Sequence, residues 1–218
     1  MEHPATANPP IPTPSYLRQY RAIGLIYGQY QPRGEKLTQG DILTPEGTVV
    51  DAVILGRLIS LAKNHLDFQQ PHLWVVYPRT GIEDDSLHLQ IVGVWEPQTF
   101  HGQQNPTITP KTAIFYQSGY FSIRGEVVFS SPEKMSVVVK IRQAPREKKQ
   151  PPKSFKLKLQ GCLPDSSLSR FWDLQVRLRG DILVLESGTD LGVIAKKAFT
   201  PSRTRLIPRK KSPPLQSL

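Results

Sequence analysis

The feature that most constrains this chain is a series of short apolar runs that alternate with polar residues and are separated by Pro, Gly and Ser. In "SFKLKLQ", for example, Phe155, Leu157 and Leu159 would lie on one face of a strand, with Lys156 and Lys158 on the other. Such runs far outnumber helical patterns. The sequence therefore predicts a mainly β, β-rich α+β protein built as one or more antiparallel barrels.

The pattern predicts one amphipathic helix, at about 50–66. The apolar residues there recur at three- and four-residue spacing and would form a single face: Val50, Val53, Ile54, Leu58, Leu61, Ala62 and Leu66. Just before it, "DILTPEGTVVD" predicts a hairpin that turns at Pro45, Glu46 and Gly47.

Composition divides the chain into four parts. The termini are rich in Pro and lack periodicity, which is typical of disordered segments. We expect a disordered lead at 1–15, a β-rich region with the helix at 16–110, an antiparallel barrel or sheet with a basic hairpin at 111–195, and a disordered basic tail at 196–218.

Two strand-like runs, "RAIGLIYGQY" and "FSIRGEVVF", place Gly inside an apolar strand, where it often marks a bend at a barrel corner. Such strands resemble the first strand of OB-fold barrels, which implies one or two OB-like barrels. A single mixed barrel with long insertions is the alternative. "PHLWVVYPRT", "LHLQIVGVWEP" and "FSIRGEVVF" together resemble a group of conserved cyanobacterial and plastid proteins. That resemblance implies a cytosolic or plastid setting and carries over no functional residues.

Positive charge is concentrated in two runs. The formal net charge is +10, but residues 1–139 sum to −2 and residues 163–195 also to −2. Residues 140–162 and 196–218 each carry +7. A balanced surface with two local basic runs indicates a polyanionic partner.

The first basic run predicts a hairpin with a cationic tip and a cationic face. We expect the following strand to extend this positive face, and the tail to act as a flexible cationic arm. The alternative for the hairpin is that its lysines protect a sheet edge from aggregation. The candidate nucleic-acid-binding residues are Lys140, Arg142, Arg146, Lys148, Lys149, Lys153, Lys156, Lys158, Arg177, Arg179, Arg209, Lys210 and Lys211.

Aromatic residues beside the basic strands are candidates for base stacking. Tyr120, Phe171 and Trp172 flank the runs, and single-stranded bases stack readily on such rings. The alternative is that the Phe-Trp pair belongs to the core.

No motif predicts catalysis or cofactor binding. The chain lacks a Walker loop, GxGxxG, HExxH and GxSxG. One cysteine allows neither an internal disulfide nor a cysteine-based zinc site. The His residues are scattered, so we interpret them as ordinary surface or half-buried residues, and the acidic 83–85 as a solvated loop. We expect no enzyme, no metal and no cofactor.

No apolar segment is long enough to span a bilayer, and the N-terminus lacks the apolar core of a signal peptide. These features favour a cytoplasmic protein, or one of the plastid stroma. The leading hypothesis is a non-catalytic protein that binds RNA or single-stranded DNA on a β platform. The alternative is an assembly or scaffold protein whose basic segments meet an acidic protein or a ribosomal partner.

Overall fold

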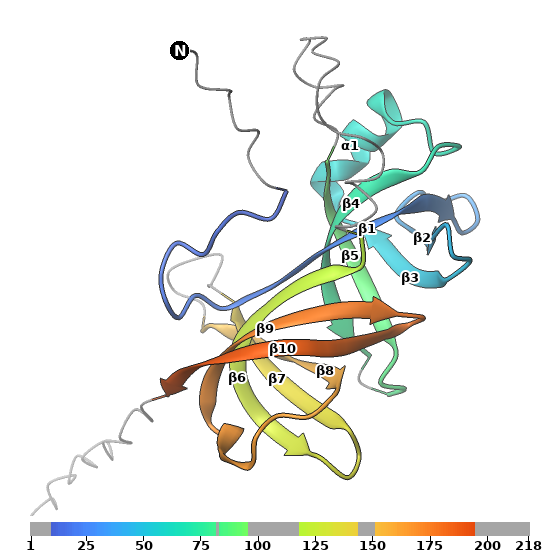
Figure 1. The fold of residues 1–218 in the computed structure, drawn as a ribbon. Coiled ribbons are helices and arrows are strands. Elements are labelled where there is room, and N and C mark those ends of the chain that lie inside the picture. Colours follow the sequence, from blue (N-terminus) through green and yellow to red (C-terminus); the bar gives the residue numbers. More distant parts are fainter. Residues whose placement is uncertain (1–9, 82, 96–117, 144–150, 195–218) are drawn as a thin grey trace, which may run out of the picture.

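The computed structural model describes residues 10–81, 83–95, 118–143 and 151–194. The first part of the chain forms a closed five-stranded barrel, here called the first barrel (Figure 1). Its ring order is β1-β2-β3-β5-β4, and β4 closes the ring by pairing with β1. All pairs are antiparallel except β3 with β5. The elements are β1 (Arg21–Pro32), β2 (Gln39–Leu43), β3 (Val49–Ile54), α1 (Gly56–His65), β4 (His72–Thr80) and β5 (Leu87–Val94).

The second part repeats this architecture. Its ring order is β6-β7-β8-β10-β9, closed by the pairing of β9 with β6, and again only one pair, β8 with β10, is parallel. The elements of this second barrel are β6 (Tyr120–Ser131), β7 (Ser136–Gln143), β8 (Lys153–Gln160), η1 (Asp165–Ser167), β9 (Arg170–Arg179) and β10 (Ile182–Val193). The mainly β prediction is confirmed, and the barrels are two rather than one.

The predicted helix begins later than expected. Residues Val49–Ile54 form strand β3, and only Gly56–His65 are helical. Val50, Ala52 and Ile54 are buried at a spacing of two, so this segment satisfies a strand pattern as well as a helical one. The turn predicted at residues 45–47 joins β2 to β3, with Gly47 N donating to Thr44 O at 2.9 Å.

A glycine occupies the same place in each barrel, where the first strand changes partners. Gly28 is the last residue of β1 to pair with β4, and Gly125 lies where β6 passes from β9 to β7. A Cβ on either would lie 2.6 Å from a backbone oxygen, that of Leu43 or Lys140 respectively. The prediction that strand-interior glycines mark barrel corners is thereby confirmed.

The two barrels are joined through their first strands, so that one ten-stranded sheet runs through both. The start of β1 pairs antiparallel with β6, and Gly24 lies opposite Phe121. A Cβ on Gly24 would lie 2.1 Å from Cδ1 of the Phe121 ring. Glycine at this position therefore allows the aromatic ring of one barrel to lie directly against the backbone of the other.

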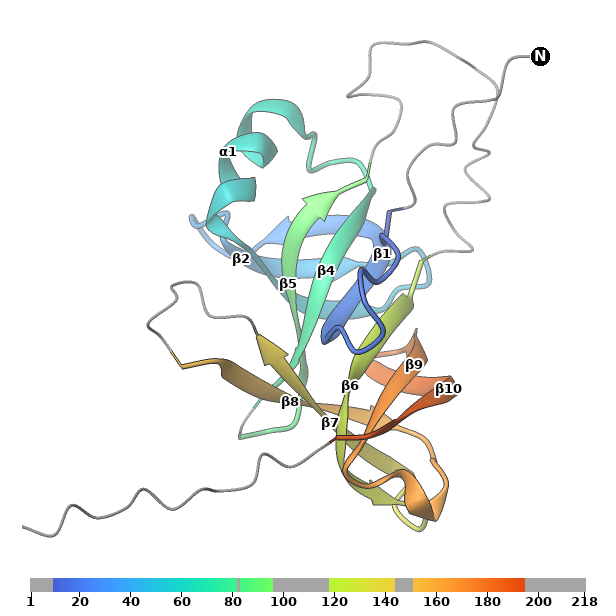
Figure 2. The same cartoon turned by 90° about the vertical axis from the view of Figure 1, so that its left-hand side faces the viewer.

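Two further contacts hold the barrels together. The Lys158 backbone N–H, on β8, donates to Oγ1 of Thr80, at the end of β4, at 2.9 Å. The segment before β1 crosses to the second barrel, where Arg18 donates to the carbonyls of Leu191 and Val193 (Figure 2). The β4–β5 hairpin and the N-terminal segment thus lie against the second barrel.

The structure describes only part of the termini that are predicted to be disordered. Residues 10–15 are irregular, and the carbonyl of Pro12 accepts a hydrogen bond from Arg21 at 2.5 Å. Residues 1–9 and the tail 196–218 lie outside the described residues. Across the described residues, no helix is long and apolar enough to cross a membrane.

Candidate nucleic-acid interface

The hairpin of β7 and β8 carries a cluster of cations on its outer side, here called the basic face. Its inner side is apolar, because Val137, Val139, Leu157 and Leu159 are all buried in the core. The alternation predicted for these strands is confirmed. The basic face consists of Lys140 and Lys156, with Arg142 at its border. Lys153, at the start of β8, is exposed but alternates with Lys156 and shares the side of Leu157.

Two lysines of the basic face lie directly opposite each other. Lys140 on β7 is the register partner of Lys156 on β8. Cross-strand neighbours of like charge repel one another. Within the described residues, no carboxylate forms an ion pair with Lys140, Lys153 or Lys156. The face thus presents cations that an external anion would neutralise.

Two other predicted cations have partners in the protein. The Lys158 Nζ lies 2.8 Å from Oδ2 of Asp85, in the β4–β5 turn of the first barrel. Arg142 lies 3.3 Å from Oε2 of Glu126 on β6, and its guanidinium is 5.5 Å from the Tyr20 ring. Lys158 therefore contributes to the contact between barrels, whereas Arg142, about half exposed, still borders the basic face.

Six predicted residues lie outside the described residues: Arg146, Lys148, Lys149, Arg209, Lys210 and Lys211. Their place in the interface stays a prediction.

The expectation of one continuous positive face across β8 and β9 is wrong. Strand β10 lies between β8 and β9 in the ring. Arg177 and Arg179, on β9, both contact Oε1 of Glu186 on β10, at 3.5 and 3.7 Å. Strands β8 and β9 follow each other in the sequence, which predicts that they are neighbours. In the ring, however, β10 lies between them and pairs with β8 in parallel.

Two of the three predicted stacking residues belong to the interior. Phe171 is 1% and Trp172 is 6% exposed. Phe171 packs edge-on against Tyr20 of the N-terminal segment, at a centroid distance of 4.9 Å, and Trp172 donates to the Ser167 carbonyl. Neither is available to a base, which corrects the stacking prediction. Tyr120 is half-buried, with the Arg177 guanidinium 5.9 Å from its ring centroid.

A pocket between the barrels contains residues that the sequence analysis did not select. This junction pocket, of about 410 Å³, lies between the N-terminal segment, β1, β4, β7 and β8. Tyr77 is 38% exposed and lies on the outward side of β4. The pattern of "WVVYPR" indicates this outward position, because Tyr77 and Arg79 alternate with buried Val76 and Pro78. The residues that give the pocket its chemistry are Tyr20, Arg21, Tyr77, Arg79, Arg142 and Phe155.

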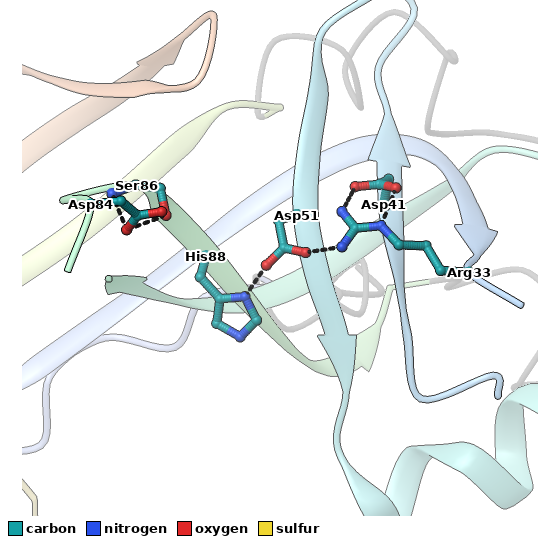
Figure 3. Close-up of polar contacts among 6 residues, drawn as sticks. All are labelled: Arg33, Asp41, Asp51, Asp84, Ser86 and His88. Carbon is teal, nitrogen blue, oxygen red and sulfur yellow. Dashed lines mark hydrogen bonds and ion pairs between the residues drawn. The ribbon is translucent and has the colours of Figure 1, made fainter. Parts of the chain in front are cut away.

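The first barrel has a different outer face. Asp41 on β2 and Asp51 on β3 are register partners, and Arg33 bridges them (Figure 3). Asp51 also contacts Nδ1 of His88 on β5, so this histidine, interpreted as an ordinary surface residue, has an acid partner. The hydrogen bonds of this network satisfy its charges internally. Among the described residues of this network, no cation is left to bind a polyanion as Lys156 is.

The acidic turn at residues 83–85 forms contacts within the protein. Asp84 accepts hydrogen bonds from the backbone and the hydroxyl of Ser86, which lower the pKa of its carboxyl (Figure 3). Asp85 pairs with Lys158. In the described part of the chain, no three His, Cys, Asp or Glu side chains are grouped to hold a metal ion.

Comparison with protein families matches each barrel to a domain model. Residues 22–102 match the N-terminal OB-fold domain of the PatR RNA-binding protein. Residues 123–192 match the C-terminal cyanobacterial OB-fold-like RNA-binding domain. Comparison with curated proteins and with solved structures found no match.

The two matches follow the same order as the two barrels, and the ring order of each barrel is that of an OB fold. Both models describe RNA-binding domains, which supports a nucleic-acid-binding role for this chain. The OB-like resemblance of the two glycine-containing strands, and the cyanobacterial resemblance, are confirmed. Each barrel is therefore similar to an OB-fold domain of the PatR type, the first barrel to the N-terminal domain and the second to the C-terminal one.

Proposed function

We propose that this protein binds single-stranded RNA without catalysis, and that the strand lies along the basic face of the second barrel. The observation that carries the proposal is the Lys140–Lys156 pair, two opposed cations that form no ion pair among the described residues. Glu126, the register neighbour of Lys140 on β6, pairs with Arg142 instead. Phosphates of an RNA backbone would relieve this repulsion and release their condensed counterions. OB folds bind oligonucleotides at the face of their second and third strands, which here are β7 and β8.

The remaining basic segments extend this proposal. Lys148 and Lys149 belong to the segment that joins β7 to β8 in the sequence, and we assign them to the same interface. The tail adds seven basic residues and no acidic ones. A cationic arm of this kind adds affinity that does not depend on sequence. We assign the tail this auxiliary role.

The test compares two double variants of equal charge. Lys140→Gln/Lys156→Gln removes the two opposed lysines of the basic face. Lys36→Gln/Lys63→Gln removes two exposed lysines from the first barrel and serves as the control. The probe is a labelled oligo(U) of about 20 nucleotides, longer than the roughly 4–16 nucleotides that one OB fold covers. Affinity is measured by fluorescence anisotropy at several salt concentrations.

We expect the basic-face variant to reduce the magnitude of the salt slope by about 1.4, because each phosphate contact on a single strand contributes about 0.7. By the same relation its affinity falls about tenfold near 0.15 M salt. The control should retain both values. An unchanged slope in the basic-face variant would indicate that these lysines protect a strand edge from aggregation instead.

Two further measurements distinguish RNA from DNA and from an acidic protein partner. A DNA oligonucleotide of matching sequence tests the contribution of the 2′-hydroxyl, through which proteins distinguish RNA from DNA. If the unmodified protein binds neither oligonucleotide, but an acidic protein partner is lost in the basic-face variant, the chain is a scaffold protein instead.

A further inference from the structure

The junction pocket exists only because the two barrels are joined. Its walls come from β1 and β4 of the first barrel, from β7 and β8 of the second, and from five residues of the N-terminal segment: Pro12, Thr13, Ser15, Gln19 and Tyr20. At about 410 Å³ it falls within the range of pockets that hold small molecules. It therefore differs from the basic face, which the second barrel forms alone.

Among the described residues, three arginines and no carboxylate line the junction pocket. Arg79 stacks on Phe155, with its guanidinium carbon 3.8 Å from the ring centroid. Within the described residues, it donates a hydrogen bond only to the Pro78 carbonyl, at 3.1 Å. Arg21 donates to the Pro12 carbonyl and to Oγ of Ser122, both neutral acceptors. Of the three, only Arg142 has a carboxylate partner in the described part of the chain, Glu126.

Burial of these cations is costly, and an anion would offset the cost. Removal from water lowers the pKa of both Arg21 and Arg79, although an arginine remains a cation at neutral pH. A guanidinium matches the geometry of a phosphate, which it binds through two parallel hydrogen bonds. Phosphate is thus the anion that suits the arginines of this pocket.

An aromatic ring is available beside the arginines. Tyr77 lines the pocket, is 38% exposed, and lies on the same outward side of β4 as Arg79. The other two aromatic rings are already engaged, Phe155 by Arg79 and Tyr20 by Phe171 and Arg142. Tyr77 is therefore the ring on which a nucleobase can stack.

We propose that the junction pocket binds one nucleotide of the RNA strand, with its phosphate at the arginines and its base on Tyr77. The strand reaches the pocket from the basic face, because Arg142 and Phe155 belong to the same hairpin as Lys140 and Lys156. This inference rests on the proposed function. It adds a site to which both barrels contribute, so that RNA binding depends on their junction.

The test measures affinity for the same oligo(U) probe in variants of Tyr77. Tyr77→Leu should weaken binding at least fivefold, since stacking on a single base contributes about that much or more. The salt slope should stay unchanged, because no charge is lost. Tyr77→Phe keeps the ring and should bind like the unmodified protein. The matched control is Tyr16→Leu, since Tyr16 is 64% exposed and does not line the pocket.

A second pair of variants tests the arginines. Arg79→Gln should lower the magnitude of the salt slope by about 0.7. Arg79→Lys keeps the charge but loses the planar guanidinium, so it should retain the slope while affinity falls. Melting curves of all variants show whether the Arg79–Phe155 contact is needed for folding. If the Arg79→Gln variant does not fold, the RNA affinities of the Tyr77 variants test the proposal.

Three outcomes would overturn the inference. If Tyr77→Leu binds RNA as tightly as Tyr16→Leu while the basic-face variant still loses affinity, RNA binding stands and the pocket is not part of it. If the unmodified protein binds no RNA, the proposed function and the pocket both fail. If uridine monophosphate saturates the pocket but Tyr77→Leu leaves RNA affinity unchanged, the ligand is a free nucleotide and not an RNA strand.

Discussion

The two barrels share a ring order and a corner glycine, yet their equivalent outer faces carry opposite charges. On the first barrel, the second and third strands place Asp41 opposite Asp51. On the second barrel, the corresponding strands place Lys140 opposite Lys156. The inward residues of both hairpins are apolar and buried. The inward positions therefore specify the barrel, whereas the outward positions give the two barrels different surface charges.

The barrels also differ in the connection that leaves their third strand. In the first barrel this connection contains the ten-residue helix α1, which covers one end of the ring (Figure 1). In the second barrel it contains the three-residue turn η1. The second barrel therefore closes its core with far less helical chain than the first.

Two large effects on stability are expected, and one of them concerns the shared glycine. Gly28→Ala and Gly125→Ala should each lower the free energy of unfolding by about 1–3 kcal/mol or more, because the added Cβ would lie 2.6 Å from a backbone oxygen that cannot easily move. Chemical denaturation measures the change. Gly56→Ala is the control, since nothing lies within 4 Å of its added Cβ. A neutral Gly125→Ala would show that the second barrel does not turn its corner as the first does.

The next effect concerns the helix that distinguishes the first barrel. Leu58→Ala should cost about 2–5 kcal/mol, because Leu58 is 7% exposed and packs in the core. Leu168→Ala, just after η1, should cost little, because Leu168 is 50% exposed. Thermal melts of both variants measure the difference. Equal losses would mean that η1 covers its barrel as fully as α1 does.

The smallest effect concerns the charge network of the first barrel. Arg33→Gln leaves Asp41 and Asp51 opposite each other without their shared cation. The loss in unfolding free energy should be within about 1 kcal/mol, because Arg33 is 54% exposed and water screens the charges. RNA affinity should not change. If Arg33→Gln weakens RNA binding as strongly as Lys140→Gln/Lys156→Gln, the first barrel also binds the strand.

Local patterns in the sequence predicted much of this fold. The alternation in β8, the turn at residues 45–47 and the glycines inside β1 and β6 each depend on neighbours within a few residues. The start of α1 was misplaced because Val50 and Ile54 satisfy both a strand and a helix spacing at the boundary between β3 and α1. Phe171 is buried on the outer side of its strand by Tyr20, a contact that no local pattern reports.

The candidate site was predictable only where it lies on one hairpin. Lys140 and Lys156 are close in sequence, and strand alternation alone predicts that each faces outward from its strand. The junction pocket joins Arg21, Tyr77 and Phe155, which come together only when the two barrels pair through β1 and β6. Likewise, the pairing of Lys158 with Asp85 depends on the docking of one barrel's hairpin against the other.

The central claim is that RNA lies on the second barrel and reaches the junction. Photo-crosslinking of the full chain to an oligonucleotide containing 4-thiouridine, combined with mass spectrometry of the crosslinked peptides, tests it most directly. We predict crosslinked peptides from β7, β8 and the junction pocket, including the peptide that contains Tyr77. Crosslinks confined to β2 and β3 of the first barrel would contradict the account.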